Sequence, residues 1–327
     1  MLSSLLNKIF EISNDKEFNA IALEIFKYQY ENNSIFKAYV NVHRSKISEI
    51  KHYTEIPFLP IQFFKSHEVI CKPNNVIKTF LSSGTSLSKR SKHHLTDLNL
   101  YGSSFLNGFK KFYGDPKDWI ILALLPSYQE QGDSSLIYMV DRLIKQSENK
   151  ESGYLNIKSK ETENKIKKLE TKKVLLIGVS FALLDLAEKK LPSLKKWTIM
   201  ETGGMKGRRK ELVREELHHI LKSQFDVDTI HSEYGMTELL SQGYAIKNGL
   251  FSCPNWMKVL VRDLEDPFSL IKNESSGGLN IIDLANVYSC SFIETQDIGK
   301  KHVNGKFEIL GRFDNSEIRG CNLLSIS

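Results

Sequence analysis

The sequence contains few cysteines and no long apolar run. Its four cysteines among 327 residues form no CxxC pair and have no zinc-ligand spacing. Thiols this sparse indicate a reducing compartment, so we expect free thiols and a cytoplasmic protein. The longest apolar runs, Trp119–Pro126 and Val174–Val179, are shorter than the roughly 20 residues that a membrane-spanning helix needs. Met1–Phe10 has no small-residue cleavage pattern and is typical of an amphipathic helix rather than of a signal peptide. We therefore expect no stable membrane span.

Several functional signatures are also absent. Basic residues outnumber acidic ones by 45 to 39, but over residues 145–173 lysines alternate with glutamates, which is typical of a solvated helix face. No basic stripe with interleaved aromatic residues is present, so we expect no nucleic-acid partner. The sequence has no Walker A loop, no HExxH pattern and no complete nucleophile elbow around Ser180. A small anionic substrate such as a nucleotide is compatible with the modest positive charge.

The order of apolar segments predicts an α/β fold. With 41% hydrophobic and 26% charged residues the composition is that of a globular chain, and the length allows two domains or one large α/β unit with lobes. Residues 1–55 show helical spacing, and strand-like runs then alternate with helical stretches, which favours a mostly parallel sheet with helices on both faces. After about residue 250 short strands predict an antiparallel sheet or small barrel.

The expected elements have the following approximate bounds. The strand candidates are Val76–Leu81, Trp119–Leu125, Lys173–Val179, Trp197–Glu201 and Val227–His231, followed by Lys258–Val261, Gly278–Asp283, Cys290–Glu294 and Phe307–Leu310. The helix candidates are Asp97–Phe112, Ser135–Gln146, Phe181–Lys189 and Arg208–Gln224. In the last of them one apolar face is expected to contain Leu212, Val213, Leu217, Ile220 and Leu221.

A hydroxyl-rich loop follows the first strand candidate. The run Ser82-Ser83-Gly84-Thr85-Ser86 precedes the basic residues Lys89 and Arg90. Backbone amides and hydroxyls of such a loop can converge on phosphate oxygens, and the glycine permits close approach. A serine-rich surface turn is the alternative.

A glycine-rich turn follows the Trp197–Glu201 strand. It contains Gly203, Gly204 and Gly207, with Lys206 and Arg208 beside them. Ligands in open α/β sheets bind at the carboxyl ends of strands, near helix N-termini. A turn that needs a positive φ would account for one of the glycines but not for three.

The third segment, His231-Ser232-Glu233-Tyr234-Gly235-Met236-Thr237-Glu238, also lies at the end of a strand candidate. Its aromatic ring can stack on a base, its glycine can approach a phosphate, and its carboxylate can hold Mg²⁺. Taken singly, Tyr234 could be a core aromatic and Glu238 a carboxylate in the first turn of a helix.

Two further segments lie among the late strands. Asp297 lies in Glu294–Gly299, and Arg312 lies in Gly311-Arg312-Phe313-Asp314. Either could be a hairpin turn, but a carboxylate such as Asp297 can also accept hydrogen bonds from two ribose hydroxyls.

In this order the five segments resemble the adenylate-forming superfamily, to which acyl-CoA synthetases belong. Within it, the chain is most similar to the acyl-protein synthetases of bacterial luminescence systems, the LuxE type. The segments that carry this second resemblance are Ile56-Pro57-Phe58-Leu59-Pro60, Phe64-Lys65, Leu125-Pro126-Ser127-Tyr128, Ser134–Met139 and Thr202-Gly203-Gly204 with Lys206-Gly207.

The resemblance implies ATP and Mg²⁺ as cofactors and a role for each segment. It places Ser82, Ser83, Gly84, Thr85 and Ser86 around the β- and γ-phosphates, Gly203 and Gly204 between adenine and the acyl carboxylate, Tyr234 and Gly235 at the nucleotide, Thr237 at the α-phosphate, Glu238 on Mg²⁺, and Asp297 and Arg312 at the ribose. The implied fold is the N-terminal body of an adenylate-forming enzyme, with residues 1–250 as an α/β body, 251–310 as a β-rich subdomain, and 311–327 as hinge motif and tail. The mobile C-terminal domain of the superfamily is expected to be missing.

The implied reaction is ATP-dependent activation of a carboxylic acid, in this family a fatty acid, followed by acyl transfer to a protein thiol. LuxE-type proteins acylate their own cysteine near the C-terminus and pass the acyl group to a reductase partner. Cys321, which follows Arg319 and Gly320, is the corresponding thiol; burial as a small apolar residue is the alternative. An acyl- or aryl-CoA ligase, a donor to a separate carrier, and a scaffold subunit that kept a nucleotide pocket remain open. The resemblance leaves two questions open. One is whether Lys89 or Arg90 faces the phosphates of ATP. The other is which residue replaces the lysine that the superfamily carries in its C-terminal domain.

Overall fold

One large mixed sheet organises the chain. The computed structural model describes residues 2–44, 46–73, 75–83, 90–125, 132–203 and 212–313. The sheet has twelve strands in the order β11-β12-β13-β14-β10-β9-β8-β7-β6-β4-β5, with β1 paired to β13. Its strands are β1 (Leu59–Pro60), β4 (Ile120–Leu124), β5 (Gly153–Tyr154), β6 (Val174–Gly178), β7 (Trp197–Glu201), β8 (Ile230–Tyr234), β9 (Gly243–Ala245), β10 (Phe251–Ser252), β11 (Met257–Arg262), β12 (Ser276–Asp283), β13 (Phe292–Lys301) and β14 (Phe307–Arg312).

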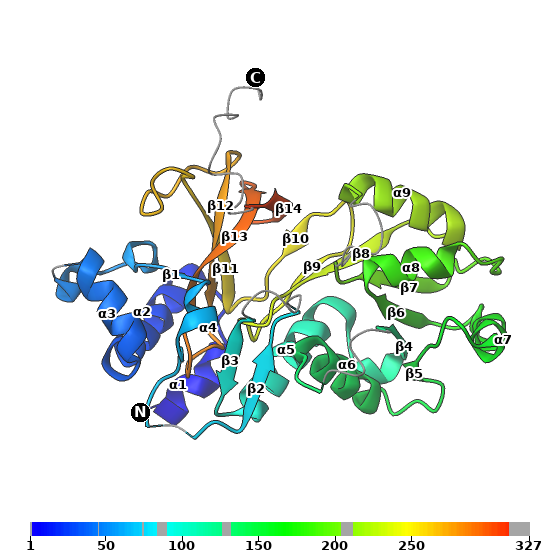
Figure 1. Ribbon diagram of the computed structural model, residues 1–327, viewed down its shortest axis with the longest axis horizontal. Coiled ribbons are helices and arrows are strands. Elements are labelled where there is room, and N and C mark those ends of the chain that lie inside the picture. The colour runs from blue at the N-terminus through cyan, green and yellow to red at the C-terminus, as the bar shows by residue number, and fades with distance from the viewer. Residues whose placement is uncertain are drawn as a thin grey trace.

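Helices cover both faces of the parallel part of this sheet. Strands β5, β4, β6, β7 and β8 are parallel to one another, and every residue of β4 and β6 is buried, as expected where both faces are covered. Figure 1 shows α8 and α9 on one side of these strands and α5 and α6 on the other. The helices are α1 (Leu2–Ile9), α2 (Asp15–Asn32), α3 (Ser34–His43), α4 (Phe63–Ser66), α5 (Leu98–Tyr113), α6 (Ser135–Gln146), α7 (Lys160–Leu169), α8 (Ser180–Ala187) and α9 (Arg214–Phe225).

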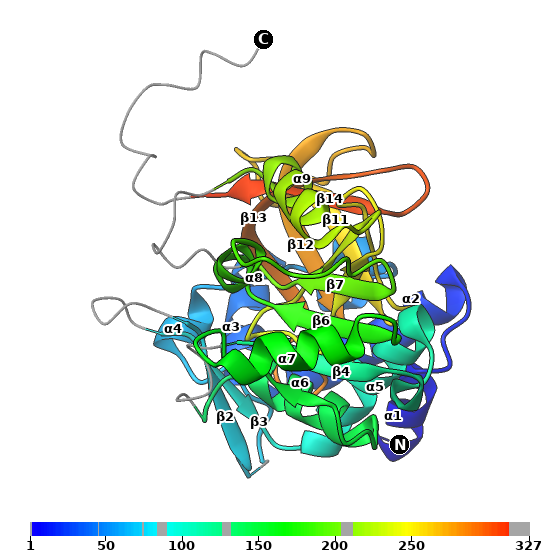
Figure 2. The same cartoon turned by 90° about the vertical axis from the view of Figure 1, so that its right-hand side faces the viewer.

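The late strands are antiparallel, as predicted, and are continuous with the parallel part. Strands β11 to β14 pair antiparallel in sequence order, and β10 and β9 join β14 to β8. Figure 2 views the molecule from the side and shows β11 to β14 above β6 and β7. The carboxyl ends of the parallel strands therefore face residues from the antiparallel half, which brings Tyr234 on β8 near Asp297 on β13.

Two expectations about the elements need correction. The segment expected as the first strand of the parallel sheet forms β2 (Lys78–Leu81), which pairs antiparallel with β3 (Lys92–Leu95) in a separate two-stranded sheet. The last helix begins at Arg214, since Val213 is the exposed N-cap residue and not part of the apolar face. Leu217 and Leu221 of that face are buried, as predicted. Pairing and helix starts depend on neighbours that are distant in sequence, which explains both misses.

The N-terminal helices reach the site through a buried polar contact. Gln29 on α2 donates to the carbonyls of Asn286 and Val287 at 2.9 and 3.0 Å, and its own carbonyl accepts from the Ser291 amide at 3.0 Å. These partners lie in the connection between β12 and β13. These hydrogen bonds attach the connection to α2, since buried polar groups are normally paired. None of the helices in the described residues is long and apolar enough to cross a membrane.

A glycine pair offers a test of packing between β13 and β14. A Cβ at Gly299 would overlap the backbone carbonyl of Glu308 and would lie 2.9 Å from the methyl groups of Leu279. We expect Gly299→Ala to lower the free energy of unfolding by about 1–3 kcal/mol, because overpacking must shift the backbone. Gly311→Ala is the matched control, since a Cβ there meets nothing within 4 Å. Denaturant unfolding measures both; equal stabilities for the two variants would contradict the packing.

Candidate active site

One cavity collects the site residues that the sequence singled out. It has a volume of about 550 Å³ and lies where the ends of β7 and β8 face β13 and β14. Its lining includes every predicted site residue that falls within the described residues: Ser82, Ser83, Gly203, Tyr234, Gly235, Thr237, Glu238, Asp297 and Arg312. The predicted residues Gly84, Thr85, Ser86, Gly204 and Cys321 lie outside the described residues, as does Lys89. Segments more than 200 residues apart in sequence thus meet at one site.

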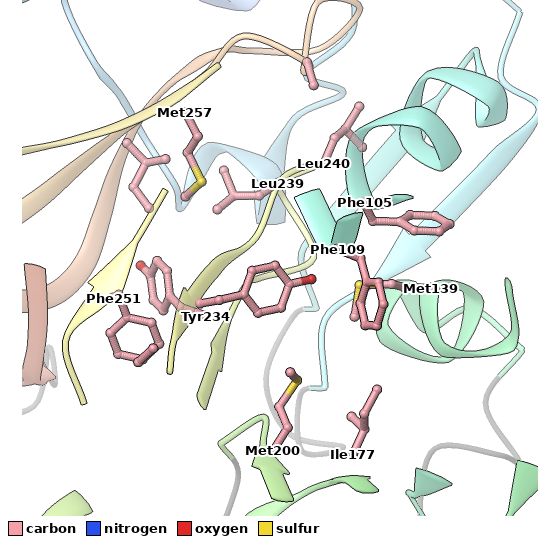
Figure 3. Close-up of a cluster of buried hydrophobic side chains, with 14 of the residues drawn as sticks. Phe105, Phe109, Met139, Ile177, Met200, Tyr234, Leu239, Leu240, Phe251 and Met257 are labelled. Atoms are coloured by element: carbon pink, nitrogen blue, oxygen red, sulfur yellow. The ribbon is translucent and has the colours of Figure 1, made fainter. Parts of the chain in front are cut away.

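Tyr234 and Asp297 form one wall of the cavity. The Tyr234 hydroxyl donates to Asp297 Oδ2 at 2.6 Å, and Arg312 Nε lies 3.8 Å from Asp297 Oδ1. The Tyr234 ring packs edge-on against Phe251 and Phe307, with ring centroids 5.9 and 5.6 Å apart, and Figure 3 shows it within this buried cluster. Burial, followed by the Asp297 charge, raises the pKa of Tyr234 well above its usual value, so the hydroxyl stays protonated. The ring is fixed, and one carboxylate faces the cavity beside it.

Glu238 is a buried carboxylate at the same cavity. Its side chain is 5% exposed. Burial raises the pKa of the carboxyl, and a hydrogen bond from Ser91 and the positive charges of Arg312 and Lys65 oppose that shift. A carboxylate in such surroundings is stabilised by a cation.

The backbone that carries Glu238 is held by His93 and Asn286. Asn286 Nδ2 donates to the Glu238 carbonyl at 2.8 Å and to the Cys290 carbonyl at 2.9 Å. His93 lies between Thr237 O, 2.7 Å from Nδ1, and Asn286 Oδ1, 3.0 Å from Nε2. Burial lowers the pKa of His93 to about 4. These contacts to the Thr237 and Glu238 carbonyls hold the loop that follows β8 in place.

Glu201 positions the start of the glycine-rich turn. Its carboxylate accepts from the Gly203 amide at 2.6 Å, and Arg214 and His218 lie 3.6 Å away. Gly203 has a φ of 72°, a conformation that favours glycine. Glu201 is 3% exposed, so this anchor is not open to solvent.

Arg90 closes the base of the hydroxyl-rich loop. Its Nε donates to the Ser82 carbonyl at 2.5 Å and its guanidinium lies 3.3 Å from Asp133 Oδ2. The Ser82 hydroxyl also accepts from the Ser91 amide at 2.9 Å. Arg90 is thus engaged with the Ser82 carbonyl and the Asp133 carboxylate.

Comparison with known proteins finds similarity at the level of structure. No protein-family model and no curated protein matches the sequence. The ATP-bound MatB of Rhodopseudomonas palustris superposes with a TM-score of 0.55 and 17% identity over 73% of this chain and 48% of its own. A 2-hydroxyisobutyryl-CoA ligase, solved in an open conformation with 2-HIB-AMP and CoA, superposes with a TM-score of 0.67 and 11% identity over 92% of this chain and 70% of its own. The luciferase-like enzyme of the nonluminescent mealworm Zophobas morio gives a TM-score of 0.51 and 15% identity over 74% and 59%.

These superpositions decide the fold. The chain has the fold of the N-terminal body of adenylate-forming enzymes. The fold class predicted from the sequence is therefore confirmed. The chain spans about half the length of MatB. The structures do not distinguish the LuxE type from other adenylate-forming enzymes.

The residues of this adenylate-forming fold fit a magnesium nucleotide. Tyr234 and Asp297 offer a ring and a carboxylate side by side, and the Thr202 hydroxyl at the cavity wall is buried with no hydrogen-bond partner within the described ranges. The Glu238 carboxylate is an oxygen ligand of the type that binds Mg²⁺. Among the described residues no group of three or more His, Cys, Asp or Glu side chains could hold a metal alone. Mg²⁺ usually takes one or two carboxylates and the phosphates, so the single carboxylate is sufficient.

Several lining residues were not predicted as site residues, among them the polar residues Lys65, Glu233 and Gln242. Lys65 on α4 and Gln242 before β9 face the cavity, as does Glu233 on β8. Lys65 and Glu233 lie in segments that the sequence singled out, but nothing in the sequence indicated that Gln242 is buried. The assignment of three cysteines to packing agrees with the structure: Cys71 and Cys290 are buried and Cys253 is partly buried.

Proposed function

We propose that this protein activates a carboxylic acid with ATP, forming an acyl-adenylate and pyrophosphate. The observation that carries the proposal is the meeting of the Tyr234–Asp297 pair, Glu238 and Ser82 at one cavity in a chain with this fold. One similar structure holds ATP and another holds 2-HIB-AMP, which supports a nucleotide as the ligand of this chain. In this proposal Tyr234 packs against adenine and Asp297 accepts from the ribose hydroxyls.

The residues act by positioning and by charge. A carboxylate oxygen of the substrate attacks the α-phosphorus, the bond to the bridging oxygen breaks, and pyrophosphate leaves with that electron pair. Thr237 and Lys65 line the cavity and would donate to the developing charge on the α-phosphate, and Glu238 would hold Mg²⁺, which would neutralise the phosphates. Because a phosphoryl centre needs little acid–base help, orientation supplies much of the rate.

We further propose that a protein thiol takes the acyl group. A thiolate attacks the acyl carbonyl, AMP leaves, and a thioester forms. Burial raises the pKa of Cys253 and of Cys290 to about 12, and that of Cys71 as well, so these thiols are poor nucleophiles at neutral pH. Cys321 remains the proposed acceptor on the resemblance to LuxE-type proteins, with a fatty acid as the acid and a reductase as the partner that this family implies.

Pyrophosphate exchange tests the activation step. Labelled pyrophosphate should enter ATP only when a suitable acid and Mg²⁺ are present. The panel should contain straight-chain, aromatic, hydroxy and amino acids. A chain that binds ATP but shows no exchange with any acid would contradict the function and favour a scaffold subunit.

The Cys321→Ser variant tests the acceptor. With ATP, Mg²⁺ and a labelled acid, the parent should acquire a hydroxylamine-labile label, and the variant should lose it while keeping exchange. Cys253→Ser is the matched control and should still be labelled. Equal labelling of Cys321→Ser would remove that thiol from the mechanism. Release of AMP that depends on coenzyme A in the variant would favour an acyl-CoA ligase instead.

A further inference from the structure

The cavity has a second wall, away from Tyr234 and Asp297, that neither the fold nor the nucleotide explains. It is formed by α5, α6, the end of β8 and the residues before β9. Its side chains are Tyr101, Ser134, Ser135, Leu136, Met139, Glu233 and Gln242. Figure 3 shows Met139 beside Phe109 of α5, where these two helices approach the sheet. This wall lies across β8 from the nucleotide residues, where the acyl part of the substrate would lie.

Glu233 points to this wall because successive strand residues alternate in direction. Tyr234 faces Phe251, Phe307 and Asp297, so Glu233 faces the opposite side of the sheet. Glu233 is the cross-strand partner of Tyr244 on β9. A Cβ at Gly235 would overlap Glu233 Oε1, so glycine at this position leaves room for the carboxylate.

The Glu233 carboxylate has no partner of opposite charge. In the described part of the chain it forms no hydrogen bond or ion pair, and Glu201, another acid, is the charge that acts on it. The phenols of Tyr101, Tyr113 and Tyr244 lie around it. Burial raises the pKa of the Glu233 carboxyl to about 8, which reflects an acid without a compensating donor.

Gln242 adds a second, independent acceptor to the same wall. Its side chain is 6% exposed, and its Oε1 is buried with no hydrogen-bond partner among the residues that the structure describes. Buried polar atoms are normally paired, and an unpaired one costs free energy. The Tyr101 hydroxyl is not the donor that Gln242 Oε1 lacks, because it donates to the Ser135 carbonyl at 3.0 Å.

We propose that the acid activated by this protein carries an amino group, which binds Glu233 and Gln242. An ammonium group has three donors and a positive charge, and the wall offers an acid and an unpaired carbonyl. Leu136 and Met139 are the apolar side chains of this wall among the described residues, and they pack on the carbon stem between the amino and carboxyl groups. This inference rests on the proposed acid activation and narrows its substrate from a fatty acid to an amino-substituted one.

Exchange with matched acids tests the inference. We compare 6-aminohexanoate, 6-hydroxyhexanoate and hexanoate, and the corresponding four-carbon acids, in the parent protein. The amino acid should have a KM about 10- to 100-fold lower than its unsubstituted homologue, the range expected for a hydrogen bond to a charged group. Glu233→Gln should reduce this discrimination to within a few-fold, with the KM for ATP as the measure of an intact nucleotide site. Glu308→Gln, an acid on β14 outside the cavity lining, is the matched control and should keep the discrimination.

The outcomes separate this inference from the proposed function. Exchange with hexanoate or longer alkanoates that equals or exceeds exchange with the amino acids would overturn the inference and leave acid activation standing. Discrimination that survives in Glu233→Gln would also overturn it. Absence of exchange with every acid, with ATP still bound, would overturn acid activation and this inference with it. If Glu233→Gln fails to fold, Gln242→Leu provides the second variant and should lower the discrimination as well.

Discussion

Glu238→Gln should lose about 100- to 1,000-fold in the rate of acid-dependent pyrophosphate exchange, the range seen when one electrostatic contact to a transition state is removed. Glutamine keeps the size of the side chain but removes the charge that would hold Mg²⁺. The Glu238 carbonyl, which accepts from Asn286 Nδ2 at 2.8 Å, is unaffected, so the loop should keep its position. Exchange rates measured over a magnesium titration give the result, and higher magnesium should restore only part of the rate.

Glu294→Gln is the control for this variant. Glu294 on β13 is also largely buried and lies 3.5 Å from Arg262, but it does not line the cavity. The Glu294→Gln variant tests whether loss of any buried acid in the antiparallel half would lower the exchange rate in the same way. Parent-like exchange in Glu238→Gln, or an equal loss in both variants, would contradict a metal-binding role for Glu238.

Asp297→Ala should raise the KM for ATP about 100-fold and leave the KM for the acid nearly unchanged. Each hydrogen bond to a charged acceptor contributes roughly 1.5–3 kcal/mol, and the proposed ribose contact has two. The variant also removes the acceptor of the Tyr234 hydroxyl, which lies 2.6 Å away. Steady-state kinetics with ATP varied at saturating acid measure the effect.

Two further variants separate the parts of this effect. Tyr234→Phe keeps the ring and the carboxylate but removes their hydrogen bond, so its KM for ATP should rise less than that of Asp297→Ala. Asp263→Ala, in the exposed turn after β11, should have no effect on the KM for ATP. If Asp297→Ala changes the KM for the acid instead, Asp297 binds the acid rather than the nucleotide.

The contacts beneath the cavity show why these side chains are held in place. Gln29 on α2 fixes the connection between β12 and β13, and Asn286 in that connection holds the Glu238 carbonyl. His93 on β3 joins Asn286 to the Thr237 carbonyl. The N-terminal helices and the small β2–β3 sheet therefore support the loop after β8, although both are far from that loop in sequence.

Local patterns in the sequence were sufficient for the elements and for much of the site. Apolar runs bounded by polar turns predicted β4, β6 and β7, and the α6 bounds were predicted as Ser135–Gln146. Buried strands and amphipathic helices depend mainly on the pattern of their own residues, so they can be predicted locally. The Tyr234–Glu238 string and Asp297 were likewise visible as short runs with a defined chemistry.

Only the tertiary structure decided which strands pair and which side chains share a wall. β2 pairs with β3, and Arg90 donates to the Ser82 carbonyl beside that pair, which no periodicity predicts. Among the described residues Glu233 and Gln242 Oε1 lack partners only because β8, β9 and α5 enclose them. Burial and pairing are properties of the packed chain, because they depend on residues brought together from more than a hundred positions apart. The scarcity of cysteine and of long apolar runs restricted the classes of protein from the sequence alone, whereas the cavity wall that contains Glu233 and Gln242 required the fold.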